Sequence, residues 1–279
     1  METAVNEKPI YMKEMDPSTT YFIDIVKNPS PELIRDAYNA YLMAFGDSSE
    51  NNGWNEFVRC KKCNKNYPYT IYSPIEKGEK DLLGIFERNK DTRCECGGEL
   101  SIYHTFESFS NEIRNLREKN GIFLVSIKNN SITGFISGHL TNDAHDIWMQ
   151  HEEEYVDKPE LKKEFLRKLA IDMVGPVLFI KEIASLNNER GLSKLQELFR
   201  HFIKELDVGK LPDIAIFWTS TESLTYNIVK NMDAQILFKN GTYRIISSFT
   251  IERLLYLLSL GPKEIVKYFL RNMREEKNN

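Results

Sequence analysis

Apolar residues recur along this chain with two different periods, and these predict helices and strands in alternation. Spacings of three to four residues predict helices over residues 30–46 and 105–121, and each ends at a glycine. Two β-rich runs, residues 121–128 and 131–140, flank a Lys-Asn-Asn-Ser turn and predict an antiparallel hairpin. The first half of the chain therefore predicts two helices followed by a hairpin.

The second half of the chain continues with the same two periods. Pro159 begins a predicted helix, and later apolar runs predict buried strands. In chain order we expect a helix over 159–174, a strand over 176–186, a loop and helix over 187–206, a strand over 213–220, a helix over 221–232, a hairpin around Asn240 and two helices around Gly261. This order predicts an α/β (α+β) fold, in which helices flank a central sheet.

All four cysteines lie in two short pairs between the first two predicted helices. Cys60 and Cys63 have two residues between them, and Cys94 and Cys96 have one. Four thiolates on two such turns are the ligands that tetrahedral zinc prefers, and they leave no open position for a reaction at the metal. We expect a structural Zn²⁺ here; four free thiols and a redox dithiol are the alternatives. The segment after Cys96, residues 99–104, reads as a strand leaving the second turn.

Composition and charge bound the class of protein. The chain has 279 residues, 41% apolar residues and a net charge of -4, which predict a soluble globular protein. Residues 56–102 carry nine Lys or Arg against eight Asp or Glu, so the near-neutral insert argues against nucleic-acid binding. We find no secretory signal and no apolar run long enough to cross a membrane, so we expect a cytoplasmic protein.

Three stretches resemble the GCN5-related N-acetyltransferase (GNAT) family. Residues 121–138, with Ile132-Thr133-Gly134-Phe135, look like its central hairpin. Residues 180–199 look like its cofactor strand, Arg-Gly loop and helix, and residues 214–239 like the following strand, helix and strand. The likeness spans roughly residues 31–46 and 104–248. It implies a mixed, mostly antiparallel sheet with helices on both faces.

The resemblance implies that the loop after the cofactor strand binds acetyl-CoA. A helix N-terminus offers unpaired N–H groups to an anion such as a pyrophosphate. The family pattern Gln/Arg-x-x-Gly-x-Gly/Ala fits in two frames: from Arg190 its glycines fall on Ser193 and Leu195, and from Asn188 on Gly191 and Ser193. The expected cofactor-binding residues are Ile183, Ala184, Asn188, Glu189, Arg190, Gly191, Leu192, Ser193 and Lys194.

Acetyl transfer to an amine needs a base for the amine proton and an acid for the leaving thiolate. Glu182 lies on the cofactor strand, a position from which carboxylates of the resembling family can act through water as base. The family's acid, a tyrosine, is absent at the matching position, Val229, and Tyr226 lies one turn earlier. We therefore expect Glu182 and Tyr226 as catalytic residues. His139, His145 and His151, beside Glu152–Glu154, are expected in a solvated loop rather than at a second metal.

These features predict three parts of the chain. Residues 1–55 and 103–250 form the acetyltransferase-like domain, residues 56–102 an inserted zinc ribbon, and residues 251–279 a helical extension. The predicted activity is acetyl transfer from acetyl-CoA to an unidentified amine, of a small molecule or a protein. The alternative function is that of a non-enzymatic adaptor, which binds a protein through the ribbon or the terminal helices. Those helices could also form a homodimer.

Overall fold

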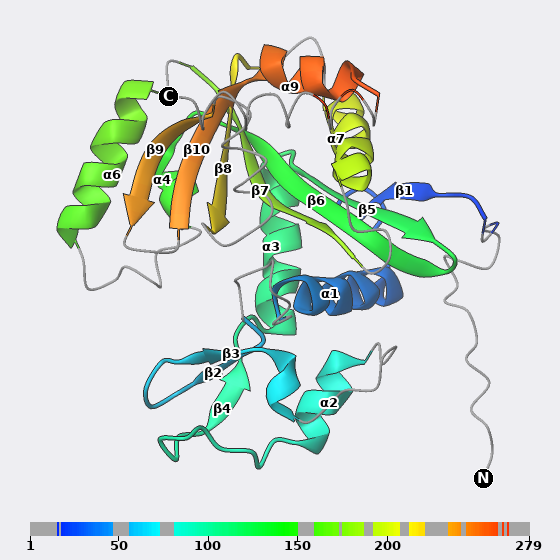
Figure 1. Ribbon diagram of the computed structural model, residues 1–279, viewed down its shortest axis with the longest axis vertical. Helices are drawn as coiled ribbons and strands as arrows, with labels where there is room; N and C mark the ends of the chain where they lie inside the picture. The colour runs from blue at the N-terminus through cyan, green and yellow to red at the C-terminus, as the bar shows by residue number, and fades with distance from the viewer. Residues whose placement is uncertain are drawn as a thin grey trace.

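A computed structural model gives the architecture of the chain (Figure 1). It describes residues 16, 18–46, 56–72, 81–149, 159–172, 175–186, 192–206, 212–220, 234–240, 244–261, 264 and 267.

A seven-stranded mixed sheet forms the centre of the fold, in the order β1-β5-β6-β7-β8-β10-β9. Its strands are β1 (Tyr21–Asp24), β5 (Ile122–Lys128), β6 (Ser131–Thr141), β7 (Val177–Ser185), β8 (Ile214–Ser220), β9 (Gln235–Asn240) and β10 (Arg244–Thr250). Every neighbouring pair is antiparallel except β7 and β8, which are parallel. The predicted mixed, mostly antiparallel sheet is confirmed.

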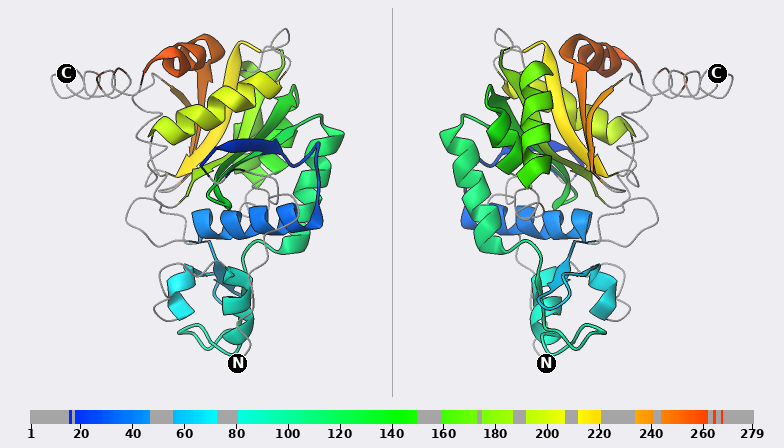
Figure 2. Two further views of the ribbon diagram at one scale, coloured as in Figure 1. Left: turned by 90° about the vertical axis from the view of Figure 1, so that its right-hand side faces the viewer. Right: turned by 90° about the vertical axis from the view of Figure 1, so that its left-hand side faces the viewer.

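Helices cover both faces of this sheet (Figure 2). One face packs against α1 (Pro31–Phe45), α3 (Phe106–Glu118), α4 (Ala144–Met149) and α6 (Pro159–Asp172). The other packs against α7 (Leu192–Glu205) and α9 (Ile251–Ser259). Among the helices that the structure describes, none combines the length and apolar character needed to cross a bilayer.

Side-chain caps fix where three of these helices begin. Ser30, Thr105 and Thr250 each accept a hydrogen bond from the backbone N–H three residues later, at the start of α1, α3 and α9. Such caps satisfy one of the N–H groups that a helix leaves unpaired. Pro31 adds a backbone angle suited to the first turn of α1.

The insert between α1 and α3 folds around a second, three-stranded sheet. This sheet has the order β3-β2-β4, from β2 (Val58–Cys60), β3 (Asn66–Tyr67) and β4 (Leu100–Ile102), accompanied by η2 (Tyr69–Tyr72) and α2 (Leu82–Arg88). It lies on the far side of α1 from the large sheet (Figure 1). Phe57 and Tyr72 of the insert belong to the same buried core as Tyr38 of α1, so the insert is packed onto α1 rather than tethered to it.

The structure confirms most predicted elements and adds six. The first two helices, the β5–β6 and β9–β10 hairpins, α6, β7, α7, β8 and α9 lie where the sequence pattern predicts them. The elements that the sequence pattern does not predict are β1, β2, β3, η2, α2 and α4. The predicted helix over 221–232 and most of the final helix lie outside the described residues.

Candidate active site and metal centre

The four cysteines converge at one end of the small sheet. Their sulfur atoms all lie within 4.8 Å of one another, and the Cys60–Cys96 and Cys63–Cys94 Sγ pairs are 3.5 Å apart. A tetrahedral zinc with bonds of about 2.3 Å would place its ligand sulfurs about 3.8 Å apart. The cluster therefore has the donor set and the size that a zinc ion requires.

The two cysteine pairs sit on matching backbone turns. Asn64 and Gly97 each follow the second cysteine of a pair, with φ angles of 59° and 76°. Asn64 N–H donates to the carbonyl of Cys60 at 2.9 Å, and Gly97 N–H to that of Cys94 at 2.7 Å. The N–H groups of Lys62 and Cys63 point at Cys60 Sγ, at 3.4 and 3.5 Å. These turns bring backbone donors to the sulfur, which stabilises its thiolate form.

A β-bulge on β7 decides where Glu182 points. In β6 pairing, Ser137 lies opposite Glu182 and Gly138 opposite Ile180, so Lys181 is an extra residue on β7. Ile180 and Ile183 both pack with the α7 core, which shows that the alternation of faces resets between them. As a result Glu182 projects to the α1 and α3 face.

Glu182 meets side chains from three other elements on this face. Ser137 Oγ on β6 lies 3.5 Å from Glu182 Oε2, and the Tyr41 hydroxyl on α1 hydrogen-bonds the same carboxyl. On α3, Glu112 approaches Glu182 and pairs with Lys181, with Oε2 2.9 Å from Nζ. His104 Nε2 lies 3.7 Å from the other oxygen of Glu112. The group combines carboxyls, a tyrosine, a lysine and a histidine within one contact network.

This environment keeps Glu182 mostly protonated at neutral pH, with about one tenth of it ionised at pH 7. Burial, and then the nearby Glu112 carboxylate, raise the pKa of Glu182 to about 8. Lys181 and the hydrogen bonds from Ser137 and Tyr41 act in the opposite direction. Glu182 nevertheless keeps partial solvent exposure. A carboxyl of this kind can take up a proton at neutral pH, as a general base must.

Next to Glu182, the two parallel strands at the centre of the sheet separate. β7 and β8 pair only where Leu178–Ile180 faces Ala215–Phe217. β7 runs on to Ser185, still paired with β6 on its other side, and β8 runs on to Ser220. Within the described part of the chain no strand pairs with β7 beyond Ile180 on the β8 side, so backbone groups there are open to an extended ligand.

The predicted cofactor residues are only partly described. Ile183 and Ala184 lie on the open stretch of β7, and Leu192 begins α7. Lys194 is buried, with Nζ 3.2 Å from Glu197 Oε2 and 5.4 Å from the centre of the Phe22 ring. Asn188, Glu189, Arg190, Gly191 and the predicted acid Tyr226 lie outside the described residues, and Ser193 lies in the first turn of α7. All of these assignments stay predictions.

The partners of Glu182 are not evident from the sequence pattern. Tyr41 lies four residues from both Ala37 and Phe45, on the apolar stripe of α1, and it is 91% buried. Glu112 carried a usable signal, since its spacing of three and four residues from Phe109 and Leu116 puts a carboxylate in the buried stripe of α3. A carboxylate on an apolar stripe indicates a partner or a function.

The expectation of a solvated histidine loop is wrong for His139. His139 lies on β6, is 4% exposed and has Nε2 2.6 Å from Asp146 Oδ2 on α4. His151 and Glu152–Glu154 lie outside the described residues.

Comparisons with known proteins find similarity to solved structures alone. No family model and no curated protein matches the chain. A GNAT-family acetyltransferase from Streptococcus pneumoniae is 9% identical, with a TM-score of 0.42, over 84% of this chain and 100% of its own. The PaiA N-acetyltransferase from Thermoplasma acidophilum, in complex with coenzyme A, is 10% identical, with a TM-score of 0.41, over 83% and 99%. NAA60 from Arabidopsis thaliana, in complex with a bisubstrate analogue, is 12% identical, with a TM-score of 0.34, over 61% and 91%. Identities and TM-scores this low do not by themselves assign a function.

Proposed function

We propose that this chain is an N-acetyltransferase that transfers an acetyl group from acetyl-CoA to an amine, with Glu182 as the general base. The observation that carries the proposal is the position of Glu182, a carboxyl with a pKa of about 8 beside the point where β7 and β8 separate. A base works best when its pKa lies near the working pH, and Glu182 meets that condition.

The open stretch of β7 fits the extended arm of a CoA thioester. Residues 181–185 offer backbone donors and acceptors on the β8 side, and Ile183 and Ala184 belong to that stretch. The N-terminus of α7, at Leu192, would supply N–H groups to a phosphate. When bound, acetyl-CoA supplies an acetyl group activated as a thioester.

The side chains around Glu182 would prepare it to accept a proton. Ionised Glu182 takes the proton from the acceptor nitrogen, which makes the nitrogen lone pair available. Tyr41 and Ser137 hold the carboxyl by hydrogen bonds from two elements, which fixes its direction. Lys181 forms an ion pair with Glu112 at 2.9 Å. Its positive charge offsets part of the repulsion between the Glu112 carboxylate and ionised Glu182.

We infer that the cysteine cluster holds a structural Zn²⁺. Four thiolates complete a tetrahedral site and leave no position for a substrate. The Tyr67 hydroxyl, 3.0 Å from Cys94 Sγ, supports the site from outside the ligand set. The metal would then stabilise the fold of the insert rather than take part in acetyl transfer.

Calorimetry with acetyl-CoA and with CoA tests the cofactor half of the proposal. We expect binding in the micromolar range, and replacing Gly191 with phenylalanine should weaken it, since the sequence places Gly191 in the phosphate loop. No heat of binding at concentrations on the order of hundreds of micromolar would refute the proposal.

Turnover of a Glu182→Gln variant tests the catalytic half. We expect acetyl-CoA binding as in the unmodified chain but at least a roughly 100-fold loss of CoA release with an amine present. Glu99→Gln, an equivalent change at an exposed carboxylate of the insert, is the control and should leave turnover unchanged. Equal losses in the two variants would contradict the role of Glu182.

A further inference from the structure

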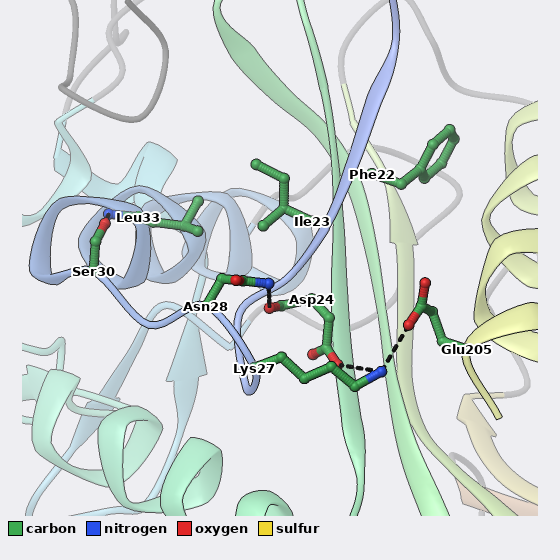
Figure 3. Close-up of a pocket in the computed structure, with 8 residues that line it drawn as sticks. All are labelled: Phe22, Ile23, Asp24, Lys27, Asn28, Ser30, Leu33 and Glu205. Atoms are coloured by element: carbon green, nitrogen blue, oxygen red, sulfur yellow. Dashed lines mark hydrogen bonds and ion pairs between the residues drawn. The ribbon is translucent and has the colours of Figure 1, made fainter. Parts of the chain in front are cut away.

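A separate pocket opens at the edge of the sheet, far from Glu182. It has a volume of about 410 Å³ and lies between β1, the turn that follows β1, and the C-terminal end of α7 (Figure 3). Phe22, Ile23 and Leu33 give it apolar walls, and Asp24, Lys27 and Glu205 give it charge. β1 is three strands away from β7 in the sheet, which is about 14 Å at the usual strand spacing.

Asp24 places a buried negative charge in this pocket. Its side chain is 3% exposed, and Oδ1 accepts hydrogen bonds from the N–H groups of Val26 and Phe123 at 3.0 and 3.2 Å. Oδ2 is buried and has no hydrogen-bond partner among the described residues. Burial raises the pKa of Asp24, as expected for a carboxylate whose charge is poorly compensated. A ligand that supplies a hydrogen-bond donor to this buried oxygen therefore gains binding free energy.

Lys27 shows where a cation sits in the pocket. Its Nζ lies between two carboxylates, 2.7 Å from Glu205 Oε2 but 3.7 Å from Asp24 Oδ2 (Figure 3). The Lys27 and Glu205 side chains are 54% and 44% exposed, and ion pairs as exposed as this contribute little to stability. Lys27 can therefore turn toward water at small cost. The position that it vacates is favourable for a positive charge, because Glu205 is the last residue of α7 and helix C-termini attract cations.

We propose that this pocket binds a small primary alkylamine, whose ammonium group replaces that of Lys27 between Asp24 and Glu205. The ammonium donates the hydrogen bond that Asp24 Oδ2 lacks, and the alkyl chain packs on Phe22, which shares the α7 face of β1 with Asp24. A free amine can approach Asp24 more closely than Lys27 does, because it is not tied to the backbone of the turn. The inference does not depend on the proposed acetyl transfer.

Calorimetric titration with n-butylamine, against butan-1-ol as an uncharged molecule of similar shape, tests the proposal. We expect millimolar binding of the amine and at least about tenfold weaker binding of the alcohol. Asp24→Asn keeps an oxygen that can accept both backbone hydrogen bonds but removes the charge, and should weaken amine binding about tenfold or more. Lys27→Met removes the internal competitor and should tighten binding several-fold.

Two further variants separate this pocket from other sites and from effects on folding. Glu182→Gln should leave butylamine binding at the pocket unchanged, since that residue belongs to the proposed acceptor site. Glu205→Gln, at the exposed end of α7, should weaken binding even if Asp24→Asn does not fold. The proposal is overturned by an absence of binding at tens of millimolar, by equal binding of amine and alcohol, or by weaker amine binding in Lys27→Met.

Discussion

Gly98 passes directly beside the cysteine cluster, and its replacement by alanine tests whether that cluster is a metal site. A Cβ atom at this position would lie 2.6 Å from Cys60 Sγ, 2.7 Å from Lys62 Cβ and 3.3 Å from Cys96 Sγ. Atoms of this kind normally approach to about 3.5–4.0 Å, so the Cys60 sulfur must move by roughly 1 Å. Metal–ligand distances tolerate about 0.2 Å. Gly98→Ala therefore removes one of four ligands.

The size of the effect follows from the binding energy of such sites. Structural zinc contributes about 10–16 kcal/mol, so one ligand of four corresponds to roughly 2.5–4 kcal/mol. The zinc dissociation constant should therefore rise by about two to three orders of magnitude. It is measured by competition with a chromogenic chelator, and circular dichroism follows the fold of the insert.

Gly97→Asn is the matched control for this experiment. Gly97 has a φ of 76° with nothing within 4 Å of an added Cβ, and asparagine already occupies the corresponding place in the other turn, at Asn64. Asparagine tolerates this backbone conformation, so zinc affinity should change only a few-fold. If Gly98→Ala and Gly97→Asn bind zinc equally well, the four cysteines do not form the proposed site.

Three further predictions concern the sheet and its buried carboxyl. Tyr41→Phe removes a hydrogen bond that lowers the pKa of Glu182, so the pH midpoint of turnover should move up by roughly half to one unit; an unchanged midpoint argues against the contact. Glu182→Gln should raise the free energy of unfolding in urea. The pKa of Glu182 is about 8 in the folded state, above the usual value of about 4.3, so this gain in stability should grow between those two pH values by at most about 1.4 kcal/mol per pH unit. Above pH 8 the gain should level off. A gain that shrinks as pH rises contradicts the burial of the charge. Gly138→Ala places a Cβ 2.4 Å from the Phe179 carbonyl and should cost about 2–3 kcal/mol in thermal unfolding. Gly261→Ala should cost little, because among the described residues its Cβ would meet Glu264 Oε2, the end of a long side chain, at 3.2 Å. Equal effects contradict the packing of β6 on β7.

Local sequence signals predict the regular elements of this fold well. The helix after Ser30 follows from a cap, a proline and an apolar stripe, and the structure begins α1 at Pro31. The cysteine spacing predicts the convergence of four sulfurs from segments about thirty residues apart. In both cases the information lies within a few neighbouring residues.

The active-site network could not be predicted in the same way. Glu182 faces Tyr41 only because Lys181 forms a bulge, and a one-residue bulge leaves no mark in an apolar run such as residues 177–186. Tyr41 and Glu112 come from two helices on either side of the insert, and their meeting depends on tertiary packing. β1 was missed because four residues give too short a pattern, yet its Asp24 anchors the edge of the sheet to Phe123.

The pH dependence of kcat/KM for acetyl-CoA-dependent acetylation tests the central claim most directly. The acceptor should be an amine whose own pKa is below about 6, so that its titration does not overlap with that of the enzyme. If Glu182 is the base, the rate rises with pH to a plateau above an apparent pKa of about 8, and Glu182→Gln abolishes both the rise and most of the rate. A profile that is unchanged in Glu182→Gln, or a midpoint at the ordinary carboxyl value, would contradict the account.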